Sequence, residues 1–429
     1  MKDTSQHGSG LNKVKRNQGP GLTMGKRAYL YKLLQDLRAS YWFLPSILVF
    51  VGLILASVMG WIDQNPDMVP FTLPDSLLDT QADGARSTLA VIAQSIIGVT
   101  GVMFSMTLVA VSFASGNFGP RLIGNFMRDR GNQISLGILI ATFVYALTVL
   151  RTVQDGNEGD VLQYVPQYSI LMALALALLC IFTLIYFVHH VPETINVSRI
   201  SASIGARLEH QIKHLIDAHE DAGTPPDIPH RAPDDVITSD TSGYIQTVNF
   251  DQLNDLAEDN DWQIRMASAI GAFVTCETHV FDIWSNDPIS DSDHAAIQGC
   301  FAVGASRTEN QNPTFLAEQL VEMVARALSP GVNDPYTAMD CLNRLAAALT
   351  VAACYEGGLQ DPAHPRVSFD HLSFDRLFAA SFPLCRQYIK PDALTLQHAR
   401  VLLDNLHEVA RSEDRAIIQT EIEMLSTTH

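Results

Sequence analysis

The sequence of 429 residues is short of charged side chains and of recognisable catalytic motifs. Charged residues make up 17% of the chain, whereas about a quarter is typical of soluble proteins. The six cysteines show no C-x-x-C spacing, which disfavours a zinc ribbon or a redox pair. No G-x-G-x-x-G, P-loop, H-E-x-x-H, G-x-S-x-G or EF-hand sequence is present. We therefore expect no enzyme, no catalytic residue, no cofactor and no metal site.

Basic residues are scarce in the second half of the chain. Residues 1–190 contain 13 basic and 11 acidic side chains, whereas residues 191–429 contain 15 basic and 35 acidic ones. The second half therefore has a net charge of −20, within a total of −18. Such a surface repels nucleic acid and attracts cations, so we expect no nucleic-acid partner.

Long apolar runs dominate the first half. A helix that crosses a bilayer needs about 20 predominantly apolar residues. Four runs meet this need, at residues 41–62, 87–118, 134–150 and 168–188. None of them contains Asp, Glu, Lys or Arg, which weighs against a proton pump or a voltage sensor. The sequence predicts a multi-pass protein with the lipid bilayer as its surroundings.

The charges beside these runs predict the orientation. Eight Lys and Arg residues precede the first run, and Arg121, Arg128 and Arg130 lie between the second and third. The other two connections are acidic. The positive-inside rule therefore places both termini in the cytoplasm. The three arginines either set this orientation and contact lipid phosphate, or form a basic collar at the cytoplasmic mouth of a pore.

The predicted fold class is a membrane protein with an all-α transmembrane region of four helices and a C-terminal α+β, mainly helical, cytoplasmic domain. We divide the chain into a basic cytoplasmic N-terminal segment (1–40), the transmembrane domain (41–190) and an acidic cytoplasmic domain (191–429). A small antiparallel β module is expected at about 240–285, with strands at 243–248, 261–266 and 272–276 and a short helix at 250–258.

The second apolar run differs from a helix that faces lipid on all sides. Small and polar residues recur along it at steps of three or four, which places them near one helix face. These residues are Gln94, Gly98, Gly101, Ser105, Ser112 and Ser115. Two interpretations stay open: close packing against a neighbouring helix, or the lining of a pore on the axis of a symmetric homo-oligomer.

The C-terminal half reads mainly as helices. A helix at 192–220 is predicted to continue from the fourth run, with apolar residues able to pack against another helix or subunit. Further helices are expected at 313–328, 335–354, 374–389, 392–411 and 412–427. His210 and His214 share one face of the first of these helices, and without a third ligand we expect them to be solvent-exposed. The turn at Ser329, Asn333 and Asp334 is predicted to cap helices, and its alternative interpretation is a ligand site.

Several motifs resemble a known family. They are Phe104–Ala110, Phe118–Leu122, Phe126–Arg130, Thr142–Leu147, Gly243–Gln246 and Leu328–Pro335. The chain is similar, over roughly residues 25–420, to a widespread bacterial family of predicted inner-membrane proteins of unknown function. The resemblance implies the four-helix topology and a location in the bacterial inner membrane, and it implies no activity.

These observations lead to two functional hypotheses. The first is a homo-oligomeric ion channel, lined by the second apolar run and controlled by the cytoplasmic domain. Inorganic cations are the expected permeant ions, because acidic vestibules concentrate cations. The alternative is a non-conducting sensor or scaffold, whose cytoplasmic domain binds a partner or ligand.

Overall fold

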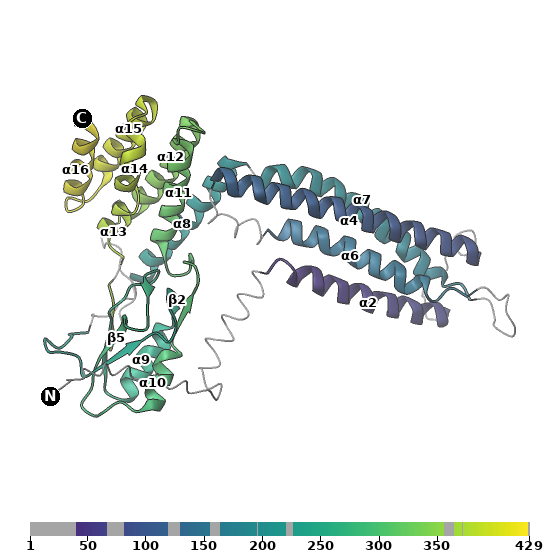
Figure 1. Ribbon diagram of the computed structural model, residues 1–429, viewed down its shortest axis with the longest axis horizontal. Helices are drawn as coiled ribbons and strands as arrows, with labels where there is room; N and C mark the ends of the chain where they lie inside the picture. The colour runs from purple at the N-terminus through teal and green to yellow at the C-terminus, as the bar shows by residue number, and fades with distance from the viewer. Residues whose placement is uncertain are drawn as a thin grey trace, which may run out of the picture.

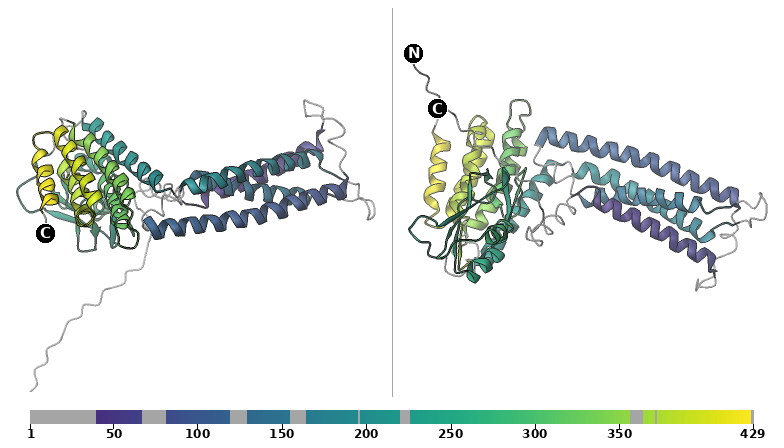
Figure 2. Two further views of the ribbon diagram at one scale, coloured as in Figure 1. Left: turned by 90° about the horizontal axis from the view of Figure 1, so that it is seen from above. Right: turned by 60° about the horizontal axis from the view of Figure 1, so that its bottom comes forward.

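The structure is a computed structural model of the chain (Figure 1). It describes residues 40–66, 81–118, 129–154, 164–194, 196–219, 226–355, 364–370 and 372–427. Of the predicted N-terminal segment, all but Ser40 lies outside these ranges. The two further views of Figure 2 show a long helical bundle with a second body of helices and strands at one end.

Four helices in the described residues are long and apolar enough to cross a membrane. They are α2 (Phe43–Gln64), α4 (Ala82–Phe118), α6 (Arg130–Leu150) and α7 (Gln167–Thr194). Helices α4, α6 and α7 each contain one of the apolar runs, and α2 covers all but the first two residues of the run at 41–62, so the predicted four-helix region is confirmed. The helices extend past the runs at several ends, because polar residues there complete the first or last turns.

Carboxylates at both ends of the bundle satisfy helix N-termini. The Asp129 carboxylate accepts hydrogen bonds from the backbone N–H groups of Gly131 and Asn132, at the start of α6. At the opposite end, the Asp63 carboxylate of α2 accepts from the N–H groups of Tyr168 (2.7 Å) and Ser169 (3.1 Å) in α7. A helix leaves its first N–H groups without partners inside the helix, so these carboxylates fix where α6 and α7 begin.

Helix α6 is the centre of the bundle and packs against α2, α4 and α7. Its contact with α2 is closest at two glycines. A Cβ atom added at Gly52 would lie 2.8 Å from the backbone oxygen of Ala141, and one added at Gly137 would lie 2.5 Å from Leu48 Cδ1. Small residues let membrane helices approach this closely. We call this contact the α2–α6 seam.

The helix predicted to continue from the fourth run is divided in the structure. Helix α7 ends at Thr194, and a separate helix, α8, spans Val197–His219. The buried side of α8 carries Ile200, Ile204, Leu208 and Ile212. It packs against α11 (Pro313–Ala327) and α12 (Pro335–Ala353) of the same chain. The apolar positions of this helix therefore serve packing inside the chain.

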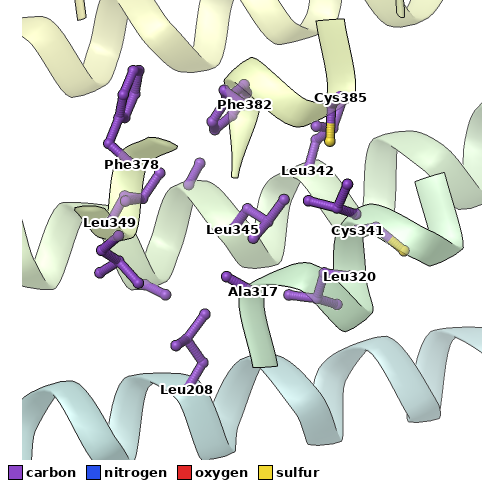
Figure 3. Close-up of a cluster of buried hydrophobic side chains, with 14 of the residues drawn as sticks. Leu208, Ala317, Leu320, Cys341, Leu342, Leu345, Leu349, Phe378, Phe382 and Cys385 are labelled. Carbon is purple, nitrogen blue, oxygen red and sulfur yellow. The ribbon is translucent and has the colours of Figure 1, made fainter. Parts of the chain in front are cut away.

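The C-terminal helices share one apolar core. The remaining members are α13 (Phe374–Ala379), α14 (Phe382–Ile389), α15 (Ala393–Val409) and α16 (Arg415–Ser426). Figure 3 shows Leu208 of α8 below Ala317 and Leu320 of α11, with Leu345 of α12 and Phe382 of α14 above them. The single helix predicted at 374–389 is wrong, because the chain turns at Ser381 between α13 and α14.

The strands form two sheets and extend beyond the predicted range. One sheet has the order β1 (Asp235–Thr238), β5 (His279–Trp284), β3 (Gln263–Met266) and β7 (Val367–Ser368). The other has the order β4 (Phe273–Val274), β2 (Gly243–Val248) and β6 (Phe301–Gly304), with α9 (Phe250–Asp259) and α10 (Asp291–Gln298) between strands. The pairing is antiparallel except between β3 and β7, which is parallel. Within the predicted range of about 240–285 the described pairs are antiparallel, as expected, and the parallel pair comes from β7, which lies outside that range.

Candidate functional site

Helix α4 has an inner face that belongs to the bundle. Its buried side chains recur at three- and four-residue steps and are mostly Ala, Leu, Ile and Met. They are Ala85, Leu89, Ile92, Ala93, Ile96, Thr100, Met103, Thr107 and Ala110. The Thr107 hydroxyl lies 3.3 Å from Asn132 Oδ1 of α6, and both side chains are buried. This face therefore fixes how α4 sits against α6 and α7.

The predicted small and polar residues lie on the opposite side of α4, which we call the outer face. Gln94, Gly98, Gly101, Ser105 and Ser112 are all exposed. A Cβ atom added at Gly98 or Gly101 would meet no described atom within 4 Å. The side chain of Ser115 lies outside the described residues. The structure thus brings five of the six predicted residues to one face, and that face contacts no other helix among the residues that the structure describes.

Apolar side chains border the outer face. Val91, Val102, Leu108 and Val109 stand three or four residues from stripe residues, share this face and are between 53% and 69% exposed. Phe104 and Met106 lie about 100° to either side of Ser105, are 44% and 48% exposed, and form the apolar flanks. The hydroxyl of Ser105 donates to the backbone oxygen of Gly101 at 2.9 Å. Because its hydroxyl is satisfied within the helix, Ser105 tolerates an apolar neighbour as well as water. The pattern is that of a narrow polar stripe with apolar flanks.

Helix α4 also connects the bundle to the C-terminal helices. Its 37 residues extend about 55 Å, well beyond the roughly 30 Å of a bilayer core. Near its C-terminal end Val111 packs against the core of the C-terminal helices. Arg326 of α11 reaches the same end, with Nη1 lying 3.5 Å from the backbone oxygen of Gly116. Movement of α11 would therefore reach the C-terminal end of α4 through direct contact.

The predicted basic cluster is described only in part. Arg121 and Arg128 lie outside the described residues, and Arg130 is the exposed first residue of α6. Beside it, Asp129 lies 2.7 Å from His190 Nε2 at the end of α7. The ring of His190 also stacks on Tyr186, with the ring centroids 4.9 Å apart. These contacts join α6 to α7 at the end of the bundle nearest the C-terminal helices.

The turn between α11 and α12 carries the capping contacts that its sequence predicts. The Ser329 hydroxyl donates to the backbone oxygen of Arg326 at 2.6 Å. The Asp334 carboxylate accepts from the backbone N–H of Thr337 at 3.1 Å and caps α12. Asn333 adopts a φ of 49°, a left-handed conformation that Asn tolerates better than most residues. Capping thus accounts for Ser329 and Asp334, and nothing further in the described contacts points to a ligand there.

A cavity of about 870 Å³ lies between α8, the two sheets and the start of α11. Its lining comes from segments far apart in the sequence, including His210 and His214, the start of α9, the start of α11 and the segment around β7. Burial raises the pKa of the Cys300 thiol in its wall to about 12, which keeps this group neutral and unreactive. Sequence reasoning missed this cavity, since no local motif marks it. Its one visible signal was the pair His210 and His214 on one helix face.

Comparisons with known proteins place the chain in a family. A family described as predicted membrane protein (DUF2254) matches residues 38–405. The chain belongs to this family. It is 31% identical over 329 residues to the uncharacterized proteins Rv1290c of Mycobacterium tuberculosis and Mb1321c of Mycobacterium bovis, a match covering 75% of this chain. The match spans 62% of the length of each of these relatives. No solved structure matches the chain.

The family resemblance found in the sequence is therefore confirmed. Together with the four apolar helices, it identifies a predicted membrane protein. Neither the family description nor the names of these relatives states an activity.

Proposed function

We propose that the protein is a homo-oligomeric ion channel of the bacterial inner membrane, with the outer face of α4 lining the pore. The observation that carries this proposal is the exposure of Gln94, Gly98, Gly101, Ser105 and Ser112 on the side of α4 opposite its own bundle. A cyclic oligomer brings the same face of each subunit to a common axis. The apolar flanks then pack against the neighbouring α4 helices, and the polar stripe faces the axis.

Cations are the permeant ions in this proposal. The chain from residue 191 onward has a net charge of −20, and the connection between the first two apolar runs is also acidic. Acidic surroundings at both ends of a pore raise the local cation concentration and lower that of anions. In this proposal both termini and the C-terminal domain lie in the cytoplasm, which the basic residues beside the apolar runs support.

The contact between α4 and α11 supports control by the C-terminal domain. Arg326 of α11 lies beside the C-terminal end of α4, the helix that would line the pore. Val111 of α4 packs on the core of the C-terminal helices. A rearrangement of α11 would therefore shift the cytoplasmic end of each pore helix.

The test is ion flux through the purified protein in liposomes, with a matched pair of variants. Ser105→Trp places a bulky ring on the stripe, and Met106→Trp places the same ring about 100° around the helix, at an exposed apolar residue. We expect the wild type to pass monovalent cations. Ser105→Trp should lower that flux at least about tenfold through steric closure of the pore, and Met106→Trp should retain most of it. Wild-type liposomes that stay silent across voltage, membrane tension and pH would rule the channel out.

A second candidate function is a non-conducting sensor, and the cavity beside α8 favours it. Pockets of roughly 300–1,000 Å³ are typical of small-molecule sites. In that case the four spans only attach the C-terminal domain to the membrane. The sensor predicts ligand binding without flux, so the liposome experiment separates the two functions.

A further inference from the structure

The cavity beside α8 lies between two hydrophobic cores of the C-terminal half. One core belongs to the C-terminal helices, and Leu215 of α8 packs at its edge. The other core belongs to the two sheets, and Phe250, Ile270 and Phe369 pack at its edge. All four side chains line the cavity and are only partly buried, so the protein leaves apolar surface uncovered there. Ligand sites are frequent where two such parts of a protein meet.

Several polar side chains of the lining are already bound within the protein. The Thr247 hydroxyl donates to Gln311 Oε1 at 3.0 Å, and Gln311 Nε2 in turn donates to a backbone oxygen of β2 at 3.0 Å. The Thr314 hydroxyl donates to Asn312 Oδ1 at 2.7 Å. Arg376 Nη1 donates to a backbone oxygen at 3.2 Å. These groups are therefore not available to hold a polar ligand.

Two buried amide atoms near the cavity are covered by protein. Asn312 Nδ2 and Gln211 Oε1 lack a hydrogen-bond partner among the described residues, and both atoms are inaccessible to solvent. Asn312 Nδ2 lies against Gly271, away from the cavity. Neither atom can contact a ligand in the cavity, so what the described lining offers to a ligand is mainly apolar surface.

The size of the cavity favours a long apolar group over a single ring. Its volume is about 870 Å³, whereas an apolar cavity of about 150 Å³ already holds benzene. One ring would leave most of this volume unfilled, and side chains beside an unfilled volume lose van der Waals contacts. A hydrocarbon chain can bend to follow both the aliphatic wall at Leu215 and Ile270 and the aromatic wall at Phe250 and Phe369.

We propose that this cavity binds the hydrocarbon chain of a long-chain fatty acid, with the polar head left outside. Each CH₂ group that leaves water adds to the affinity and needs no hydrogen bond from the wall. His210, His214 and Asp251 are exposed lining residues, so they mark the side on which the cavity is open to solvent. The head group stays at that side, where water satisfies it.

The site is connected to the membrane region through α11. Pro313 and Thr314 in the first turn of α11 line the cavity, and Arg326 in the last turn of this helix contacts the end of α4. In a channel, occupancy of the cavity would therefore change the ion flux. This consequence rests on the proposed function, whereas binding itself does not.

Binding is measured on the full-length protein in liposomes, with a palmitic acid that carries a photoreactive diazirine on its chain. Mass spectrometry of the illuminated protein locates the label. We expect label in segments that line the cavity, at residues 247–251 and 266–270, and also on the four membrane helices, which contact lipid. An excess of palmitic acid or of 1-hexadecanol should remove the label from the lining segments only, because a single site can be saturated and a lipid surface cannot.

Three results of this experiment overturn the proposal. The first is the absence of label from the lining segments, or label there that neither competitor removes. The second is competition by palmitic acid but not by 1-hexadecanol, which would show that the protein reads the carboxylate and not the chain. The third is competition by phenanthrene alone, which would show that the cavity holds fused rings.

Two substitutions at one position of the lining locate the chain, each with a matched control. Ala267→Phe fills part of the cavity, and Ala295→Phe places the same ring on the exposed surface of α10 outside the lining. Ala267→Asp adds little volume, and its carboxylate remains in water while the cavity is empty but would lose that water to a bound chain. Its control is Ala295→Asp. Both Ala267 variants should lose most of the label in the lining and keep that on the membrane helices, whereas both Ala295 variants should keep both. Label in the lining that neither Ala267 variant changes overturns the proposal.

Flux in liposomes is then compared with and without palmitic acid. A change in flux in the wild type that is absent in Ala267→Asp supports the link through α11. Labelling of the lining without any flux leaves the chain-binding site intact and contradicts only the channel.

Discussion

The α2–α6 seam and the outer face of α4 both carry glycines in membrane-spanning helices, but the glycines have different surroundings. At the seam, a Cβ atom on Gly52 or Gly137 would collide with the facing helix. On the outer face, a Cβ atom on Gly98 or Gly101 would meet no described atom within 4 Å. Glycine at the seam is therefore required by the fold of one chain, whereas glycine on the outer face has no such role among the described parts of the chain.

This difference separates two interpretations that the sequence leaves open. Close packing inside the bundle does not explain the stripe, because the stripe faces away from α6 and α7. What remains is a role outside the single chain, either against lipid, against a second copy, or around water. The predictions below use pairs of matched substitutions to test this division.

The largest effect on stability is expected at the seam. Gly52→Ala places a methyl group 2.8 Å from the backbone oxygen of Ala141, and a backbone atom cannot move aside alone. Overpacking of this kind lowers the free energy of unfolding by about 1–3 kcal/mol. Gly60→Ala is the control in the same helix, since no described atom lies within 4 Å of its added Cβ. Thermal unfolding in detergent should show a lower midpoint for Gly52→Ala only, and equal midpoints would contradict the seam.

A smaller effect is expected from the hydroxyl groups of α4. Thr107→Val removes the hydrogen-bonding contact to Asn132 and leaves Asn132 buried. This change should lower the free energy of unfolding by about 0.5–1.5 kcal/mol. Ser105→Ala removes a hydroxyl that bonds only to its own helix and is exposed, so its midpoint should stay close to that of the wild type. The same unfolding experiment measures both variants. If Ser105→Ala were the more destabilising one, the assignment of inner and outer faces would be wrong.

The smallest effect on stability is expected for Gly101→Ala. The added methyl group has free space, and alanine favours a helix over glycine by up to about 1 kcal/mol in water. The midpoint of the single chain should therefore stay the same or rise slightly. Gly137→Ala, whose Cβ would lie 3.1 Å from Pro45 Cα, should lower it. A clear loss of stability in Gly101→Ala would show that the outer face is already tightly packed.

Much of the helical structure is predictable from local patterns. The four spans follow from apolar length, and α11 and α12 follow from Asn312-Pro313 and Asp334-Pro335, in which each N-cap residue precedes a proline in the first turn. The stripe on α4 follows from helical spacing. Its direction does not, because the exposed side of a membrane helix can be as apolar as the buried one.

Tertiary contacts decide the features that sequence reasoning missed. Strand β5 is buried on both faces except at His279, so it lacks the alternation that marks a strand with one exposed face. Its Asp282 is buried and paired with Arg265 of the neighbouring strand, a partner that only the sheet provides. Strand β7 is two residues long and pairs with β3 from about 100 residues away. The cavity depends on that pairing, so no local pattern predicts it.

Thiol labelling of the assembled protein in membranes tests the central claim most directly. The exposed native thiols Cys276 and Cys354 are first replaced by serine. Single cysteines are then placed on the outer face, at Gln94, Ser105 and Ser112, and on its flanks, at Phe104 and Met106. A water-filled pore predicts that a membrane-impermeant thiol reagent modifies the outer-face cysteines quickly and the flank cysteines slowly. Equally slow modification at all five positions would show that the outer face of α4 meets no water, and it would contradict the channel.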